Sequence, residues 1–329
     1  MYWFIPPAVL LICLLLILPA WCLFRFTCVR KPETATPKKL LSPEFLAGQE
    51  WMSRQSPEPM EIIAFDGLSL HGMLYSVPKP KGTVIAFHGY RSRYDIDFAP
   101  QARFYARQGY NLLLPMQRAH PGSEGKYITF GVKERFDAKL WVYRITEHFG
   151  HAHPIVLAGI SMGASTVLMA GQLALPDNVQ GLIADCGFTT PWAIIRHVAK
   201  RYFHLPPFPL LYLANGFARA FAAFDFRDAS APEALEVNPL PVLFIHGDAD
   251  HFVPMDMSEK NYEACISPKK LLIIPNAGHA SAYSTDPDTY QKAVKEFLHS
   301  LPHGKTDSSP SAAQAPPQTL DTPRRIETP

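Results

Sequence analysis

Three stretches of the 329-residue chain carry side chains that together could perform nucleophilic catalysis. Gly159-Ile-Ser-Met-Gly163 places Ser161 between two glycines, directly after the apolar run Ile155-Val-Leu-Ala158. A serine hydroxyl attacks a carbonyl group when a base takes its proton and a third group orients that base. Asp250 and His279 are the candidates for these tasks, and each follows an apolar run farther along the chain. The sequence therefore predicts a serine, an acid and a histidine, in that chain order.

The glycines around Ser161 predict a sharp turn between a buried strand and a helix. An Ala-, Leu- and Met-rich segment without proline follows, to about Leu175. Gly159 and Gly163 would let the strand and the helix approach closely, where a Cβ would collide with neighbouring backbone. Ser161 would then lie at the helix N-terminus, where free N–H groups can receive negative charge. A Gly/Ser loop that merely joins two core elements is the alternative for this pattern.

A fourth strand end offers donors for the negative charge that develops on a carbonyl oxygen. The run Thr83-Val-Ile-Ala-Phe87 leads into His88-Gly89, where a bare glycine would let backbone N–H groups face a substrate. His88 itself is predicted to support this loop by hydrogen bonding. Asp248 and Asp185 also stand near strand ends and are alternatives to Asp250 as the acid. For Asp248 a turn cap is the simpler interpretation, and for Asp185 a hydrogen-bonded loop anchor.

Alternating apolar runs and helical stretches must position these residues, and they predict an α/β fold. Residues 60–65 and 68–75, joined at Asp66-Gly67, are typical of an antiparallel hairpin. Short apolar runs follow at 83–87, 111–114, 155–158, 182–184, 242–245 and 271–274. Helical stretches alternate with them at 96–108, 132–149, 163–175, 256–265 and 287–299. This order predicts a mostly parallel sheet with an antiparallel start and helices on both faces.

One segment, residues 189–235, interrupts the alternation with aromatic, proline-containing and helical sequence but no strand pattern. After a strand end, such an insertion would lie over the carboxyl edge of the sheet, where ligands bind in folds of this kind. We interpret it as a lid; a larger crossover packed on the core is the alternative. The folded domain is predicted to span residues 60–301, and the Ser-, Pro-, Thr- and Gln-rich residues 302–329 are predicted to be disordered.

The N-terminal residues 3–24 form an almost continuous apolar run without a charge, long enough to span a membrane. A cleaved signal peptide is the alternative, but no Lys or Arg precedes the run and Trp21 is too bulky for a processing site. Residues 1–29 are thus predicted to be a transmembrane anchor and residues 30–59 a tether. The cations after the run predict a cytoplasmic body; they are Arg25, Arg30, Lys31, Lys38 and Lys39.

Bulk composition excludes several other classes of function. With a net charge of +2 and scattered Lys and Arg residues, the chain is a poor candidate for nucleic-acid binding. The five cysteines show no CxxC pair, no Cys/His spacing of a metal site and no disulfide framework. Cys186 and Cys265, in the body of the chain, fit a reducing compartment. No cofactor, metal or nucleic-acid partner is expected.

Together these motifs resemble those of the α/β-hydrolase superfamily, over residues 60–300. Gly159-Ile-Ser-Met-Gly163 is similar to its nucleophile elbow and His88-Gly89 to its oxyanion loop. His246-Gly-Asp-Ala-Asp-His-Phe-Val-Pro254 is similar to the segment that carries the acid, and Gly278-His279 to the one with the catalytic histidine.

Two further stretches narrow the resemblance to the bacterial serine-aminopeptidase-like and monoacylglycerol-lipase-like branch. They are Arg118-Ala-His-Pro-Gly-Ser-Glu-Gly125 and Ala184-Asp-Cys-Gly-Phe188. The first departs from the pattern, because Ala119 and Pro121 stand where that loop usually has glycine.

The resemblance implies a role for each site residue. Ser161 would be the nucleophile, His279 the general base and then acid, and Asp250 the group that fixes the histidine tautomer. The backbone N–H groups of Tyr90 and Met162 would form the oxyanion hole. The predicted function is a membrane-anchored serine hydrolase that cleaves an ester, thioester or amide of an apolar acyl substrate through an acyl-enzyme. A non-catalytic member that binds a ligand or partner, and an aminopeptidase-type amide hydrolase, are the alternatives.

Overall fold

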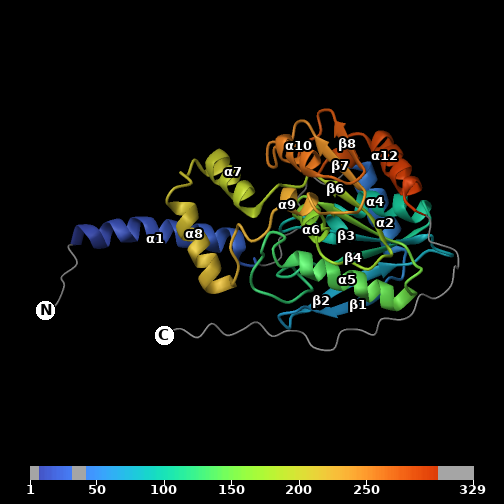
Figure 1. Ribbon diagram of the computed structural model, residues 1–329, viewed down its shortest axis with the longest axis horizontal. Coiled ribbons are helices and arrows are strands. Elements are labelled where there is room, and N and C mark those ends of the chain that lie inside the picture. Colours follow the sequence, from blue (N-terminus) through green and yellow to red (C-terminus); the bar gives the residue numbers. More distant parts are fainter. Residues whose placement is uncertain (1–6, 32–41, 303–329) are drawn as a thin grey trace.

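A mixed sheet lies at the centre of the computed structural model, which describes residues 7–31 and 42–302 (Figure 1). Its eight strands are β1 Glu58–Ile63, β2 Ser69–Tyr75, β3 Gly82–Phe87, β4 Tyr110–Pro115, β5 Ile155–Ile160, β6 Val179–Asp185, β7 Val242–Gly247 and β8 Lys269–Ile274. They lie side by side in the order β1-β2-β4-β3-β5-β6-β7-β8. β1 and β2 pair antiparallel, as do β2 and β4, and all later neighbours pair parallel. The predicted α/β fold with an antiparallel start is confirmed.

Helices cover both faces of this sheet (Figure 1). They are α1 Pro7–Cys28, α2 Pro43–Ser53, α3 Tyr94–Asp97, α4 Ala99–Arg107, α5 Glu134–Phe149, α6 Met162–Ala170, α7 Pro191–Phe203, α8 Leu210–Phe217, the π-helix η2 Ala218–Ala222, α9 Ala231–Leu235, α10 Met255–Ala264, α11 Ala282–Thr285 and α12 Pro287–Ser300. The buried side chains form two hydrophobic clusters. Every residue of β3, β4, β5 and β7 is buried. These strands are mostly apolar because both of their faces are covered.

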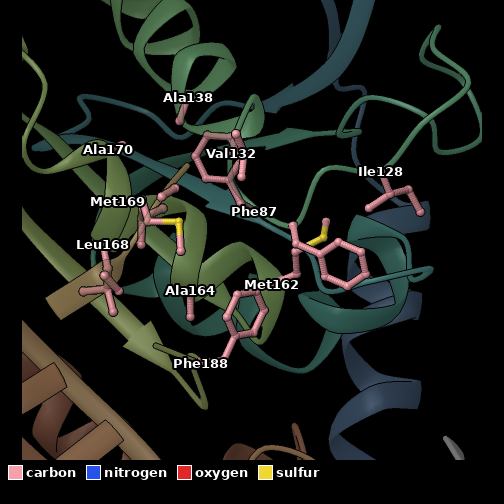
Figure 2. Packing of buried hydrophobic residues seen from close by; sticks show 14 of the residues in the cluster. Phe87, Ile128, Val132, Ala138, Met162, Ala164, Leu168, Met169, Ala170 and Phe188 are labelled. Carbon is pink, nitrogen blue, oxygen red and sulfur yellow. The ribbon is translucent and has the colours of Figure 1, made fainter. Parts of the chain in front are cut away.

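Helix α6 is buried along its whole length and holds the turn before it in place. Each of its residues is buried, and the small or apolar side chains around most of the helix suit a position inside the protein. Figure 2 shows how its side chains pack among those of other elements, with Met162, Ala164, Leu168 and Met169 beside Phe87, Val132, Ala138 and Phe188. The N-terminus of α6 therefore has a fixed position at the carboxyl edge of the sheet.

The insertion at residues 189–235 folds into α7, α8, η2 and α9. Figure 1 shows α7 and α8 set apart from the sheet, beside α1. Helix α7 buries Ile194 and Ile195, whereas Tyr202 and Phe203 at its end are exposed. The segment lies where the predicted lid would lie, and its buried side chains also join the larger hydrophobic cluster.

The N-terminal apolar run differs from expectation, because its second half belongs to the folded domain. Ala20, Phe24 and Cys28 are buried, and the ring of Trp21 lies 5.1 Å from that of Phe217 in α8. Among residues 7–31 and 42–302, we find no helix long and apolar enough to cross a membrane. The predicted membrane anchor over residues 3–24 is therefore not supported. Protein covers Leu23 and Phe24 at the end of the run.

The predicted tether also contains part of the domain. Helix α2 lies within residues 30–59 and buries Phe45 and Met52 in the cluster on the α4 side of the sheet. The domain thus begins before residue 60. Residues 1–6 of the predicted anchor, 32–41 of the predicted tether and 303–329 of the predicted disordered tail lie outside the described residues.

Candidate active site

Ser161 occupies a strained turn between β5 and α6. Its backbone has φ 56° and ψ −115°, a conformation that residues other than glycine rarely adopt. A Cβ on Gly159 would come within 2.2 Å of the Gly163 carbonyl carbon, and one on Gly163 within 1.9 Å of the Phe87 carbonyl oxygen. The sequence pattern therefore predicted the turn for the right reason, since strand and helix meet here backbone to backbone.

We expect Gly163→Ala to destabilise the protein by at least about 3 kcal/mol, because the Phe87 backbone cannot move away from the new Cβ without shifting β3. Gly216→Ala in α8 is the matched control, since its Cβ would meet nothing within 4 Å. The control should stabilise by about 0.5–1 kcal/mol through helix propensity. Urea unfolding monitored by circular dichroism measures both changes. Equal stability of the two variants would contradict the close approach.

The three predicted catalytic side chains lie in hydrogen-bond contact at the carboxyl ends of their strands. His279 Nε2 is 3.0 Å from Ser161 Oγ, and His279 Nδ1 is 2.7 Å from Asp250 Oδ2. With Nδ1–H donating to the carboxylate, Nε2 is free to accept the serine proton. The structure thus brings together residues that are 118 and 29 positions apart in the sequence.

Asp250 is held as a carboxylate by several donors. The N–H groups of Phe252 and Val253 each donate to Oδ1 at 2.9 Å, and His246 Nε2 lies 3.4 Å from Oδ2. Burial opposes ionisation, but the hydrogen bonds from His246 and His279 outweigh it and hold the pKa of Asp250 well below its usual value. Sequence reasoning missed His246 as a supporting group; its only signal was a histidine inside an apolar strand.

The two alternative acids have other partners. Asp248 Oδ1 accepts a 2.6 Å hydrogen bond from the Asn276 N–H, so it binds the loop after β8 and does not cap its own turn as expected. Asp185 is buried beside Tyr290, whose hydroxyl is its hydrogen-bond partner. Burial raises the pKa of Asp185 to about 6, although the charge of His246 and the Tyr290 hydrogen bond favour the ionised form. Neither side chain hydrogen-bonds His279 within the described residues.

The raised pKa of Asp185 predicts a pH-dependent cost to stability. A folded-state pKa of about 6 means that the folded protein holds this proton more tightly than the unfolded chain, whose Asp pKa is about 3.9. The cost is absent below about pH 4, grows up to about pH 6 and stays constant above. Asp185→Asn should therefore raise Tm by about 2–6 °C at pH 7.5 and leave it almost unchanged at pH 4. Calorimetry at both pH values checks this, and an equal gain at both would contradict it.

Two backbone donors belong to residues close to Ser161: Met162 follows it in the chain, and Tyr90 lines the same cavity. The neighbours of Tyr90 use their own N–H groups, because Gly89 donates to Asp97 Oδ2 at 2.6 Å and Arg91 to His120 Nε2 at 3.0 Å. Within the described part of the chain, the N–H groups of Tyr90 and Met162 donate to no other group. Both remain available for the oxygen of a bound carbonyl group, as an oxyanion hole requires.

His88 is buried and supports by hydrogen bonding the loop after β3, residues 88–93, which we call the Tyr90 loop. Its Nε2 accepts from the Gln117 N–H at 3.1 Å, so its Nδ1 is the donor to the Gly89 carbonyl at 2.8 Å. Burial, followed by the proximity of His120, lowers the pKa of His88 well below its usual value. The ring is therefore neutral and positions the loop, as its place in the sequence predicted.

The end of α1 is tied to the same loop, a connection that sequence reasoning did not find. Tyr90 Oη donates to the Thr27 carbonyl at 2.8 Å, and the Arg91 guanidinium donates to the Phe26 carbonyl. The Ile128 N–H donates to the Cys28 carbonyl at 2.7 Å. The carbonyl groups at a helix C-terminus need such partners. Here Ile128 supplies one of them, and the loop with the predicted oxyanion donor supplies the others.

Two cavities reach the hydrogen-bonded pair Ser161 and His279. The first has a volume of about 330 Å³, is lined almost wholly by apolar groups and includes Ser161. Helix α1 contributes Leu23, Phe26 and Thr27 to its wall, and α7 contributes Ile194, Ile195, Val198, Ala199, Tyr202 and Phe203. The second has a volume of about 670 Å³, is more polar and includes His279.

One group of possible metal ligands converges within the described residues, namely Cys186, Asp250 and His279 within 4.8 Å. Asp250 and His279 direct these atoms at each other. Burial and the charge of Asp185 raise the pKa of Cys186 well above its usual value, so its thiol stays protonated and is a poor ligand. The group is better explained as an acid–histidine pair beside a neutral thiol.

Comparisons with known proteins identify a family. The model of the Alpha/beta hydrolase family matches residues 84–292. Uncharacterized protein YqkD of Bacillus subtilis is 29% identical over 252 residues, which cover 75% of this chain and 82% of that protein. Uncharacterized protein YfhR of Escherichia coli is 25% identical over 253 residues, covering 74% and 81%.

Solved structures share the fold. Esterase Pf2001 of Pyrococcus furiosus superposes with a TM-score of 0.63 at 24% identity, covering 83% of this chain and 98% of that one. Est1E of Butyrivibrio proteoclasticus, solved with ferulic acid bound, gives 0.57 at 22% identity, covering 73% and 98%.

Proposed function

The chain belongs to the alpha/beta hydrolase family, and we propose that it is a serine hydrolase that cleaves carboxylic esters through an acyl-enzyme. The observation that carries the proposal is the hydrogen-bonded series Ser161–His279–Asp250, with contacts of 3.0 and 2.7 Å, beside an apolar cavity. The esterase structures of the same fold support the reaction class by analogy.

In this proposal each group has one task. His279 Nε2 takes the hydroxyl proton while Ser161 Oγ bonds to the ester carbon, and the N–H groups of Tyr90 and Met162 stabilise the resulting oxyanion. The C–O bond to the alcohol then breaks, and His279 returns the proton to the departing oxygen. Water repeats the two steps on the acyl-enzyme, which releases the acid and restores Ser161. Asp250 stabilises the imidazolium that forms in each step.

The apolar cavity supports an apolar acyl chain as the substrate class. Its walls include Leu23, Phe188 and Ile194, and hydrocarbon placed against such side chains gains about 25 cal/mol per Å² of area removed from water. We place the chain in the serine-aminopeptidase-like and monoacylglycerol-lipase-like branch on the motif around Arg118. Thioesters and amides use the same chemistry and are the alternatives within this proposal.

A fluorophosphonate probe tests the proposal directly, because it phosphonylates only an activated serine. The folded protein should be labelled at Ser161, located by fragmentation of the modified peptide, and Asp250→Asn should slow the labelling. Absence of label on folded protein would overturn the proposal and favour a non-catalytic member that binds a ligand in the same cavity.

We also propose that the part of α1 ahead of Ala20 contacts a membrane, with the domain on the cytoplasmic side. The support is the apolar run at residues 3–24, the cations after it and the exposure of Leu15, Ile17 and Leu18. The part of α1 at residues 7–19 is shorter than the about 20 residues that a span needs, so it fits the membrane interface better. Removal of residues 1–19 should shift the protein from the membrane pellet to the supernatant. Recovery of the full-length chain in the supernatant would refute the proposal.

A further inference from the structure

The proposed reaction fixes where the two halves of its substrate must lie. The acyl carbon must reach Ser161 Oγ, whereas the departing oxygen must reach His279 Nε2 to receive its proton. Ser161 lines the first, apolar cavity, and His279 lines the second cavity. The second cavity is therefore on the side where the alcohol portion of an ester leaves.

Positive charge dominates this second cavity. Lys31, Arg91 and Arg93 line it, and Asp97 is the one carboxylate among its lining residues within the described part of the chain. Asp97 is already committed, since it accepts hydrogen bonds from the Gly89 N–H at 2.6 Å and from Ser92 Oγ at 2.6 Å. Arg93 pairs with Asp95. The charge that remains comes from Arg91 and Lys31.

Within residues 7–31 and 42–302, the ion pairs of Lys and Arg with carboxylates include neither Arg91 nor Lys31. The Lys31 ammonium lies 4.0 Å from the centre of the Phe26 ring, and the Arg91 guanidinium lies 5.2 Å from it. Both cations thus share one ring. Burial and then the charge of Arg91 lower the pKa of Lys31, and burial lowers the pKa of Arg91. An anion bound between them would relieve both effects.

We propose that this cavity binds the leaving group of the substrate and that this group carries a phosphate. The inference rests on the proposed function and specifies its substrate as an apolar acyl chain esterified to a phosphate-bearing alcohol or thiol. Arginine and lysine are the side chains that bind phosphate oxygens in proteins. The volume of about 670 Å³ exceeds the needs of a small neutral alcohol. Arg91 borders both cavities, so the phosphate would lie close to the reacting ester.

The experiment compares kcat/KM of the full chain for 1-octanoylglycerol, 1-octanoylglycerol 3-phosphate and octanoyl-coenzyme A, below their micellar concentrations. Charge-assisted hydrogen bonds predict that at least one phosphate substrate exceeds the neutral ester by about 10- to 100-fold. Preference for the glycerol phosphate identifies an alcohol leaving group, and preference for the coenzyme A thioester identifies a thiol. Higher salt should reduce the preference.

Substitutions locate the effect. Lys31→Gln should lower the ratio of phosphate-ester to neutral-ester kcat/KM by about 5- to 10-fold, mainly through KM. Arg91→Lys, which keeps a cation beside α1, should lower it as well, because the two-donor face of the guanidinium is lost. Lys260→Gln is the matched control, since Lys260 is exposed on α10, lines neither cavity and should leave the ratio unchanged.

The outcomes separate the two proposals. If the neutral ester is cleaved as well as or better than both phosphate substrates, or if neither Lys31→Gln nor Arg91→Lys changes the ratio, the phosphate inference is overturned while the hydrolase stands. If no ester is cleaved and the fluorophosphonate probe does not react, the proposed function itself fails.

Discussion

Ser161→Ala is expected to lower kcat for p-nitrophenyl octanoate by a factor on the order of 10⁶, the largest effect of any single substitution in this chain. The methyl group cannot form the acyl-enzyme, and the neighbouring His279 then has no hydroxyl to activate. Catalysis that remains would come from the N–H groups of Tyr90 and Met162 and from binding alone. Stopped assays with high enzyme concentration measure the residual rate.

The control for Ser161→Ala is Ser53→Ala, at the exposed end of α2, which should keep full activity. Removal of the strained serine should leave the protein folded, and thermal unfolding checks this independently. A Ser161→Ala protein that retains more than about one hundredth of the wild-type kcat would contradict the assignment of the nucleophile.

Asp250→Asn is expected to lower kcat by about 10⁴, because an asparagine neither fixes the Nδ1–H tautomer of His279 nor stabilises its imidazolium. Asp185→Asn makes the same chemical change on the neighbouring strand end and should alter kcat by less than about tenfold. The pair discriminates between the two carboxylates that the sequence offered as the acid. Steady-state kinetics at pH 7.5 measures both variants.

The opposite ranking, with Asp185→Asn more damaging than Asp250→Asn, would transfer the role of the acid to Asp185. It would then be necessary for His279 to leave the position 2.7 Å from Asp250 Oδ2. Labelling by the fluorophosphonate probe should follow the same order as kcat, since both depend on the basicity of His279 Nε2.

The central sheet could be predicted from the sequence because its strands are covered on both faces. Burial of every residue in β5 and β7 requires continuous apolar runs, and such runs stand out between helical stretches. Ser161, Asp250 and His279 could be found because the carboxyl ends of parallel strands meet at one edge. Their positions after apolar runs were therefore enough to predict that residues from three distant loops lie together.

Other features leave no separate mark in the sequence. An apolar helix looks the same whether lipid or protein covers it, so the burial of Phe24 and Cys28 could not be distinguished from a membrane span. His246 supports Asp250 through a contact of 3.4 Å across a turn, and the sequence pattern shows only an isolated polar residue. The charge of the second cavity also depends on tertiary contacts, since Lys31 and Arg91 meet around Phe26.

The bonds between the last turn of α1 and the Tyr90 loop affect how the protein should be produced. A shortened version that starts after residue 29 would appear to discard only a troublesome hydrophobic leader. It would in fact remove the carbonyl groups that accept hydrogen bonds from Tyr90 Oη and the Arg91 guanidinium. It would also remove one side of the apolar cavity that includes Ser161. If the chain is the proposed serine hydrolase, poor turnover by such a preparation would reflect the loss of these contacts and not weak intrinsic activity.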